Sequence, residues 1–234
     1  MITPDNRTEM LVKAIQNAII SGVIKPGDKL PPLRNLAKDY HVSRSVVNSA
    51  ISTLSTKGYI NIVPRHYIVI NDFLSTGSLT ILKDIYESDN KVLKRKMIFE
   101  TLACRMIVER NSIKTIVTSL NIDLEPIKSV IEQERLWQAD AAHDITVLYV
   151  LDLSFHNSII ALAQNMVFSL IYHQFEYLAK PMIAIFYSNP QVIDFVLDKH
   201  LQIYLALKNH NRDQALSLIE DLLTHGEQEL LKVI

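Results

Sequence analysis

Four residues in the C-terminal half of the sequence have side chains that commonly bind divalent metals. Asp152 and His156 are four positions apart, so on a helix their side chains share one face and can hold a single ion together. His200 and His225 follow on later segments and are further candidate ligands. The alternative is that Asp152 and His156 form a buried polar pair and that the other histidines are exposed.

The same region also contains the ingredients of a metal-dependent phosphohydrolase. His143 and Asp144 are adjacent and precede Asp152, His156 and His200. Adjacent His-Asp pairs are common by chance, and an enzyme of this kind does not account for the N-terminal part of the chain. It remains one alternative for the function of this region.

Other residues of the C-terminal half are candidates for a ligand cavity. Lys96, Glu100 and Arg105 belong to one predicted helix and are candidates for a cavity or for a dimer seam, although Lys96 and Glu100 could equally form a surface pair. Tyr172 belongs to an apolar, aromatic segment. Its residues are either core or the wall of a cavity suited to an acyl chain: Phe168, Leu170, Ile171, Tyr172, Phe175, Tyr177, Met182 and Phe186.

The sequence Ser43-Arg44-Ser45 places a guanidinium and two hydroxyls at the start of a predicted helix. Ser43 is a good N-cap, and the free N–H groups and dipole of a helix N-terminus favour phosphate. Arg44 can bind guanine O6 and N7 through two hydrogen bonds in a DNA major groove.

The elements around Ser43 predict a winged helix-turn-helix. Apolar spacing predicts a helix over 6–21, a short helix opening at Leu30-Pro31-Pro32, and a third helix ending before Gly58. Two strands, 59–63 and 67–70, then flank Pro64-Arg65-His66. In this arrangement Arg34 and Asn48 would reach DNA backbone or base edges. Arg65 and His66 would lie at the tip of the wing, in or beside the minor groove.

Composition is typical of a folded, mainly α protein. The chain has 234 residues, of which 48% are hydrophobic and 21% charged, which excludes a mostly disordered protein. Its one cysteine, Cys104, excludes a disulfide framework and a cysteine-based zinc module. The sequence shows no secretion signal pattern and no uninterrupted apolar run of the length that a membrane helix needs. We therefore expect a cytoplasmic protein with no membrane partner.

Charge is distributed unevenly along the chain. Residues 1–72 contain nine Lys and Arg against five Asp and Glu, a net charge of +4, within a chain of net charge −1. The remainder therefore carries −5. A basic N-terminal segment followed by an acidic remainder suggests a nucleic-acid-binding part joined to a regulatory part.

The rest of the chain predicts an all-α antiparallel bundle. Polar residues 75–79 suggest a linker, so we expect a DNA-binding domain over 1–74 and a helical domain over 75–234. Helical periodicity is found at 78–88, 91–109, 111–120, 125–138, 144–163, 166–187, 190–208 and 212–232.

The first seventy residues resemble the DNA-binding domain of the GntR family of transcription regulators. The resemblance rests on Gly22 to Ala37, on Val42-Ser43-Arg44-Ser45-Val46-Val47, and on Gly58-Tyr59-Ile60. It differs at the wing, where Pro64-Arg65-His66 lacks the usual glycine. The helical body is similar to the FadR branch, on anchors such as Asn71-Asp72-Phe73 and Tyr187-Ser188-Asn189-Pro190.

This resemblance implies a regulator rather than an enzyme. Members of the branch have a helical domain that binds a small effector, such as a fatty acyl-CoA or a carboxylate, and they bind operator DNA as homodimers. Many hold a divalent metal (zinc, nickel or manganese) with one aspartate and three histidines, which implies Asp152, His156, His200 and His225. His225 lies about one turn beyond the expected position, where Leu222 stands. Metal-free members of the branch, including those that respond to fatty acyl groups, keep the alternative of a metal-free bundle open.

Overall fold

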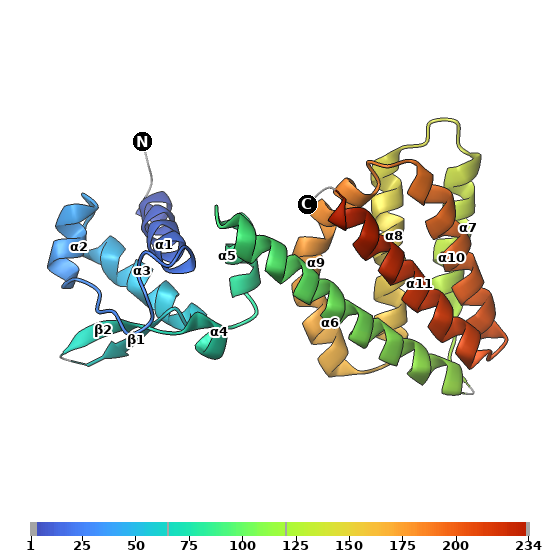
Figure 1. Cartoon of the computed structure of the whole chain (residues 1–234), viewed down its shortest axis with the longest axis horizontal. Helices are drawn as coiled ribbons and strands as arrows, with labels where there is room; N and C mark the ends of the chain where they lie inside the picture. The colour runs from blue at the N-terminus through green and yellow to red at the C-terminus, as the bar shows by residue number, and fades with distance from the viewer. Residues whose placement is uncertain (1–3, 65, 120, 233–234) are drawn as a thin grey trace. The chain divides into compact units, whose positions relative to one another are not determined.

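The computed structural model describes residues 4–64, 66–119 and 121–232, and these divide into two compact units between Met97 and Ile98. Each unit has its own hydrophobic core. The boundary predicted near residue 75 falls inside the first unit and stays a prediction about domains. Helix α6 (Lys91–Thr118) begins in the first unit and continues into the second (Figure 1).

The first unit is a three-helix domain with a two-stranded hairpin. It contains α1 (Pro4–Ile20), α2 (Leu33–Asp39), α3 (Arg44–Lys57), β1 (Ile60–Val63) and β2 (Tyr67–Ile70). The strands are antiparallel, with Ile60 opposite Ile70 and Val63 opposite Tyr67. Helix α3 packs on both α1 and α2, burying Val47 and Leu54 completely. The predicted winged helix-turn-helix is confirmed.

The limits of α3 follow from its terminal residues. The Ser43 hydroxyl accepts a hydrogen bond from the Val46 amide at 3.3 Å, as an N-cap does. Gly58 ends the helix with a φ of +89°, a left-handed conformation that favours glycine. A Cβ at Gly58 would also lie 2.5 Å from the Thr76 carbonyl oxygen, so any larger residue at this position would clash with the backbone of Thr76.

Residues 73–87 are more structured than the sequence suggested. A short helix, α4 (Phe73–Thr76), occupies part of the predicted linker, and α5 (Ile81–Glu87) follows within the same unit. Asp84 on α5 is buried and accepts hydrogen bonds from Gln16 Nε2 at 2.9 Å, Lys57 Nζ at 2.8 Å and Tyr59 Oη at 3.1 Å. These donors come from α1, from the last turn of α3 and from the residue before β1, so α5 is anchored to the hairpin-bearing unit.

The second unit is a helical bundle. After α6 come α7 (Glu125–Ala139), α8 (Ile145–Leu162), α9 (Met166–Phe186), α10 (Gln191–Lys208) and α11 (Arg212–Leu231). Helix α7 packs on α8 and α10, and α11 packs on α9 and α10 (Figure 1). The all-α prediction is confirmed. The separation of 91–109 from 111–120 is wrong, because α6 is continuous and the Asn111 side chain donates to the Ile107 carbonyl one turn earlier.

The single tryptophan joins two helices of the bundle. Trp137 is buried on α7, and its Nε1–H donates to the Asp144 carbonyl oxygen at 2.7 Å. Asp144 in turn caps α8 by accepting from the Thr146 amide at 2.9 Å. The end of α7 and the start of α8 are therefore fixed to each other.

Helix α8 is long and apolar enough to cross a membrane by length and composition. It contains no uninterrupted apolar run of that length, because Asp152 and His156 interrupt it, so the sequence did not predict this property. In the structure α8 packs on α7 and α9 and buries Leu148, Phe155 and Ile159 in the core of the bundle. The buried apolar face of α8 is therefore accounted for by the bundle core.

Candidate functional site

The first unit presents a polar surface on α2 and α3. Arg34 is exposed on α2, and Ser43, Arg44, Ser45 and Asn48 are exposed on the first turns of α3 or at its N-cap. Because Val46, Val47 and Ala50 of the same helix are buried, the exposed side of α3 is the side that carries the guanidinium, hydroxyl and amide groups. These groups can donate to phosphates and base edges.

The hairpin adds a second part to this surface. Arg65 lies outside the described residues, and His66 is exposed next to Tyr67 at the start of β2. Lys29 was not predicted, but its Nζ lies 4.1 Å from the centre of the Tyr67 ring and so brings a positive charge to the hairpin. The signal for Lys29 was weak, because a lone lysine between two turns has no distinctive pattern.

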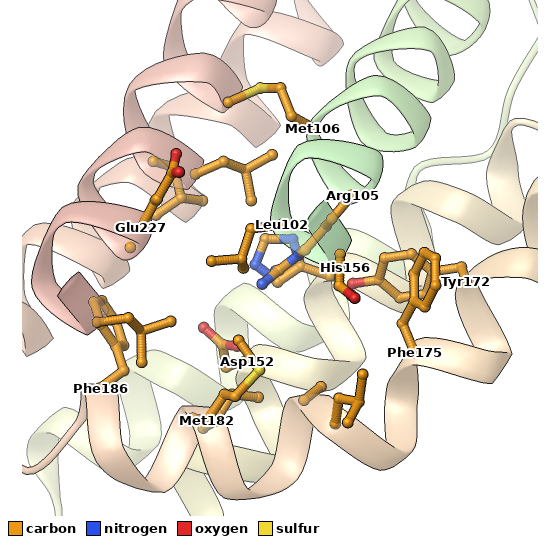
Figure 2. A pocket seen from close by; sticks show the side chains of 18 of the residues that line it. Leu102, Arg105, Met106, Asp152, His156, Tyr172, Phe175, Met182, Phe186 and Glu227 are labelled. Carbon is orange, nitrogen blue, oxygen red and sulfur yellow. The ribbon is translucent and has the colours of Figure 1, made fainter. Parts of the chain in front are cut away.

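The second unit contains a cavity of about 450 Å³ between α6, α8, α9, α10 and α11 (Figure 2). This volume is within the usual range for small-molecule sites. Most of the wall is apolar; Arg105, Asp152, His156 and Tyr172 form one polar group, and Glu227 lies on another part of the wall. The apolar wall includes these side chains: Leu102, Met106, Phe175, Leu178, Met182, Ile183, Phe186, Val196, Leu222, Leu223 and Leu230.

A buried network connects three of these polar groups through Glu109, which is on α6 one turn after Arg105. Glu109 is 0% exposed, and it accepts hydrogen bonds from Arg105 Nε at 2.5 Å and from Tyr172 Oη at 3.3 Å. Its Oε2 also lies 2.5 Å from His156 Nδ1, within hydrogen-bond distance. Helices α6, α8 and α9 are thus joined at one carboxylate.

The charges in this network control its protonation. Burial alone would raise the pKa of Glu109, but Arg105 and His156 outweigh it and lower the pKa to about 2. Burial and the Arg105 charge lower the pKa of His156, while burial raises the pKa of Tyr172. Glu109 is therefore ionised, and His156 and Tyr172 are neutral near pH 7.

Asp152, His156 and His200 form a cluster at the wall of the cavity, where Asp152 and His156 line it. All three are buried, and one ligand atom from each lies within 4.8 Å of the others. Asp152 Oδ1 accepts from Tyr187 Oη at 2.9 Å. His200 is 0% exposed and packs against the Phe155 ring at a centroid distance of 3.7 Å. Its Nε2 has no hydrogen-bond partner and lies 3.9 Å from Asp152 Oδ1.

The separation of His200 Nε2 and Asp152 Oδ1 fits a shared cation. Metal–nitrogen and metal–oxygen bonds of about 2.0–2.2 Å separate two ligand atoms by at most about 4.4 Å. The 3.9 Å between His200 Nε2 and Asp152 Oδ1 is too long for a hydrogen bond, but it suits two atoms on one ion. A buried imidazole nitrogen without a partner is also unfavourable unless something binds it. Asp152 and His156 line the cavity, so a site built on these residues opens into it.

The other predicted site residues lie elsewhere. His225 is outside the cluster, with its ring 4.1 Å from that of Phe195, while Leu222 lines the cavity. Lys96 and Glu100 are exposed and are not among the residues that line the cavity. The structure therefore groups Asp152, His156 and His200 with Arg105 and Tyr172.

The residues that suggested a phosphohydrolase have structural partners. His143 is exposed and its ring packs edge-on against Trp137 at 5.2 Å. Asp144 is the N-cap of α8. Neither belongs to the Asp152, His156 and His200 cluster.

Sequence reasoning missed two buried glutamates of the site, Glu109 and Glu134. Glu134 lies on α7 and is 2% exposed, and its Oε1 is 2.7 Å from His200 Nδ1. Both glutamates are far along the chain from their histidines, so local spacing carries no signal for either contact. A usable signal was Glu134 itself, which interrupts the apolar face of α7 formed by Ile127, Val130, Ile131 and Trp137.

Two family models match the two parts of the chain. Residues 7–70 match the model of bacterial regulatory proteins of the gntR family, and residues 100–225 match the FCD domain. The second match covers more than half of the chain. The chain belongs to the GntR family, in its FadR-type branch with an FCD domain. It is a transcription regulator of this family and not an enzyme.

Curated relatives and solved structures agree with this membership. The chain is 24% identical over 228 residues to the HTH-type transcriptional regulator LutR of Bacillus subtilis, covering 91% of this chain and 95% of the relative. It is 22% identical over 214 residues to the fatty acid metabolism regulator protein of Pasteurella multocida, covering 91% and 82%.

Two solved structures share the fold. The Lar structure, described as controlling the Listeria monocytogenes agr system, has a TM-score of 0.60 at 18% identity and 97% coverage of both chains. E. coli McbR/YncC has a TM-score of 0.52 at 15% identity and 99% coverage of both chains.

Proposed function

We propose that this GntR-family regulator binds a palindromic operator as a homodimer, in the cytoplasm, and that a small effector in the FCD cavity controls its affinity for DNA. The observation that carries the proposal is the 450 Å³ cavity, in which an apolar wall meets Arg105, Asp152 and His156. A dimer would place two copies of α3 in successive major grooves, with half-sites about 10 bp apart or somewhat less.

The proposed DNA contacts follow from the exposed surface of the first unit. Arg44 reads a guanine, Arg34 and Asn48 contact backbone or base edges, and Ser43 and Ser45 contact phosphate at the N-terminus of α3. Arg65 and His66 belong to the hairpin and are assigned to the minor groove or its edge.

The proposed effector is amphipathic, with an acidic head and an apolar body. A small carboxylate or a fatty acyl group has this character. The apolar wall suits the body, and the polar end of the cavity suits the head. Arg105 is already paired with Glu109, so its guanidinium alone offers little attraction for a carboxylate. Lys96 and Glu100 are exposed, which favours a role at a dimer seam over one in the cavity.

We infer that a divalent cation completes the polar end of the cavity, held by Asp152, His156 and His200. Asp152 and Glu134 are buried acidic residues in this region, and Arg105 already pairs with Glu109, so a bound cation would offset negative charge there. When bound, a divalent ion would provide a Lewis-acid position for an acidic ligand. Two histidines with a carboxylate suit zinc, nickel or manganese.

The DNA-binding part is tested with Arg44→Ala. We expect an operator affinity lower by about 5- to 150-fold in gel-shift titration at fixed salt, because a bidentate base contact contributes about 1–3 kcal/mol. Lys13→Ala is the matched control, since Lys13 is an exposed cation of the same unit that pairs with Glu87. An Arg44→Ala protein that folds and binds the operator as tightly as the wild type would contradict the assignment.

The sensor part is tested by thermal unfolding with added ligands. Zinc, nickel or manganese should raise the Tm of the wild-type chain, because binding to the folded state alone is stabilising. The rise should be lost in His156→Ala. A decanoate or acyl-CoA probe should raise the Tm further. A Tm that no ion, carboxylate or acyl-CoA changes would favour a DNA-binding protein without an effector.

A further inference from the structure

We propose that Glu109 and Glu134 are positioning residues, which hold His156 and His200 with Nδ1 protonated and Nε2 directed toward a cation at Asp152. The inference rests on the proposed cation site and extends it to residues outside the ligand set. It explains why two carboxylates, 0% and 2% exposed, are buried in the bundle.

Both histidines make the same kind of contact on the same nitrogen. His156 Nδ1 lies 2.5 Å from Glu109 Oε2, and His200 Nδ1 lies 2.7 Å from Glu134 Oε1. A carboxylate can only accept, so each Nδ1 carries a proton and donates it. In a neutral imidazole the other nitrogen, Nε2, is then the one that has a free lone pair.

The Nε2 side of His200 agrees with this assignment. Among the residues that the structure describes, His200 Nε2 is the buried side-chain nitrogen or oxygen that has no hydrogen-bond partner. It lies 3.9 Å from Asp152 Oδ1. The two imidazoles meet edge to face, with ring centres 5.5 Å apart and planes at 84°. Two lone pairs that approach from nearly perpendicular rings can converge on one ion.

The two glutamates come from helices on different sides of the site. Glu109 belongs to α6 and is itself fixed by Arg105 and Tyr172, whereas Glu134 belongs to α7 and lines a separate cavity of about 210 Å³. Arg105 balances the charge of Glu109. Glu134 therefore adds the larger negative field at the site, and carboxylate partners of this kind also make an imidazole a stronger ligand.

The first experiment needs no mutation. Two-bond ¹H–¹⁵N spectra of the metal-free, full-length protein at pH 7.5 report which ring nitrogen of each histidine carries the proton. We expect the Nδ1–H form for both His156 and His200. The Nε2–H form, or a doubly protonated ring, at either residue would overturn the proposal.

The second experiment measures cation affinity in a variant. Glu134→Leu removes the acceptor at similar volume, and we expect a zinc Kd 10- to 100-fold weaker by competition with a chelating dye. Glu132→Gln, an exposed change on the same helix, is the control and should bind as the wild type does. An unchanged Kd in Glu134→Leu would overturn the positioning role of Glu134.

These measurements separate the inference from the proposed function. If the wild-type protein shows both Nδ1–H rings but binds no zinc, nickel or manganese, the cation site is wrong and the tautomer assignment stands. A Glu134→Leu protein that does not fold leaves the wild-type spectra as the deciding test. A merely structural role for Glu134 would lower the Tm without changing the tautomer of His200.

Discussion

The second unit is organised around individual carboxylates that are buried away from water. Asp152, Glu109 and Glu134 are buried, and each accepts a hydrogen bond from a phenol or an imidazole. A buried carboxylate that loses a partner is costly, because its desolvation is no longer compensated. Individual donors around these groups are therefore the sensitive positions.

Tyr187→Phe tests this sensitivity at Asp152. Removing the Tyr187 hydroxyl takes away its 2.9 Å hydrogen bond, and we expect the metal-free protein to lose about 1–3 kcal/mol of stability. Saturating zinc should reduce the loss, because a cation at Asp152 offsets the missing donor. Chemical unfolding with and without zinc measures both values. Tyr149→Phe, in the ring stacked on Tyr187, is the control. An equal loss in both variants would contradict the prediction.

Residue patterns predicted part of this site and missed the rest for definable reasons. Asp152 and His156 were found because four-residue spacing on a helix is a local signal. Glu109 and Glu134 reach histidines 47 and 66 positions away, which only the packing of helices brings about. His225 was predicted as a ligand from its residue type and its order in the sequence. In the structure its ring packs on Phe195, and Leu222, one turn earlier on the same helix, lines the cavity instead.

At the scale of elements, the helices were predicted well where their ends carry distinct residues. Ser43 and Gly58 limit α3, and Asn165 caps α9, as local chemistry dictates. The predicted break at residue 110 was wrong, because α6 is continuous from Lys91 to Thr118, and Arg110 within it pairs with Glu220 of α11. Helix α4 was missed because four residues give no measurable periodicity.

Tyr59 provides a pH test of how α5 is anchored. Burial, and then the charge of Asp84, raise the pKa of Tyr59 above its usual value near 10. The folded state then keeps a proton that the unfolded chain releases above about pH 10, so stability falls as pH rises beyond that point. Tyr59→Phe should show a smaller fall between pH 9 and pH 11 in urea unfolding followed by circular dichroism.

The control for this test is Tyr40→Phe, an exposed tyrosine of the same unit. It should follow the wild-type pH dependence. If Tyr59→Phe and the wild type lose the same stability over this range, the buried Tyr59–Asp84 contact does not contribute to alkaline unfolding. At pH 7 Tyr59→Phe should cost about 1 kcal/mol, since Asp84 keeps its bonds from Gln16 and Lys57.

For the molecule as a whole, the distribution of charge along the chain was more informative than the net charge. The net charge of −1 conceals a basic segment over 1–72, which is where the exposed Arg34 and Arg44 lie. The family membership places this basic part before an FCD domain. The sequence could not predict how copies of the chain contact one another, because such contacts depend on surfaces that no local pattern specifies.

The proposed homodimer has a direct measurement. Light scattering after size-exclusion chromatography should give twice the chain mass of 26.7 kDa, because a two-fold dimer matches a palindromic operator. One dimer should bind each operator, and scrambling one half-site should weaken binding sharply. A mass of one chain at micromolar concentration, with one chain bound per operator, would contradict the dimer.

The position of Trp137 gives the protein a natural optical probe. It is the only indole in the chain, it is buried on α7 one turn after Glu134, and its N–H is held by the Asp144 carbonyl. Emission excited at the red edge of the absorption band will therefore come from the second unit alone. The emission wavelength and its quenching can be used to follow ligand binding and unfolding of the bundle without any label. The hairpin-bearing unit has no tryptophan and does not contribute to this signal.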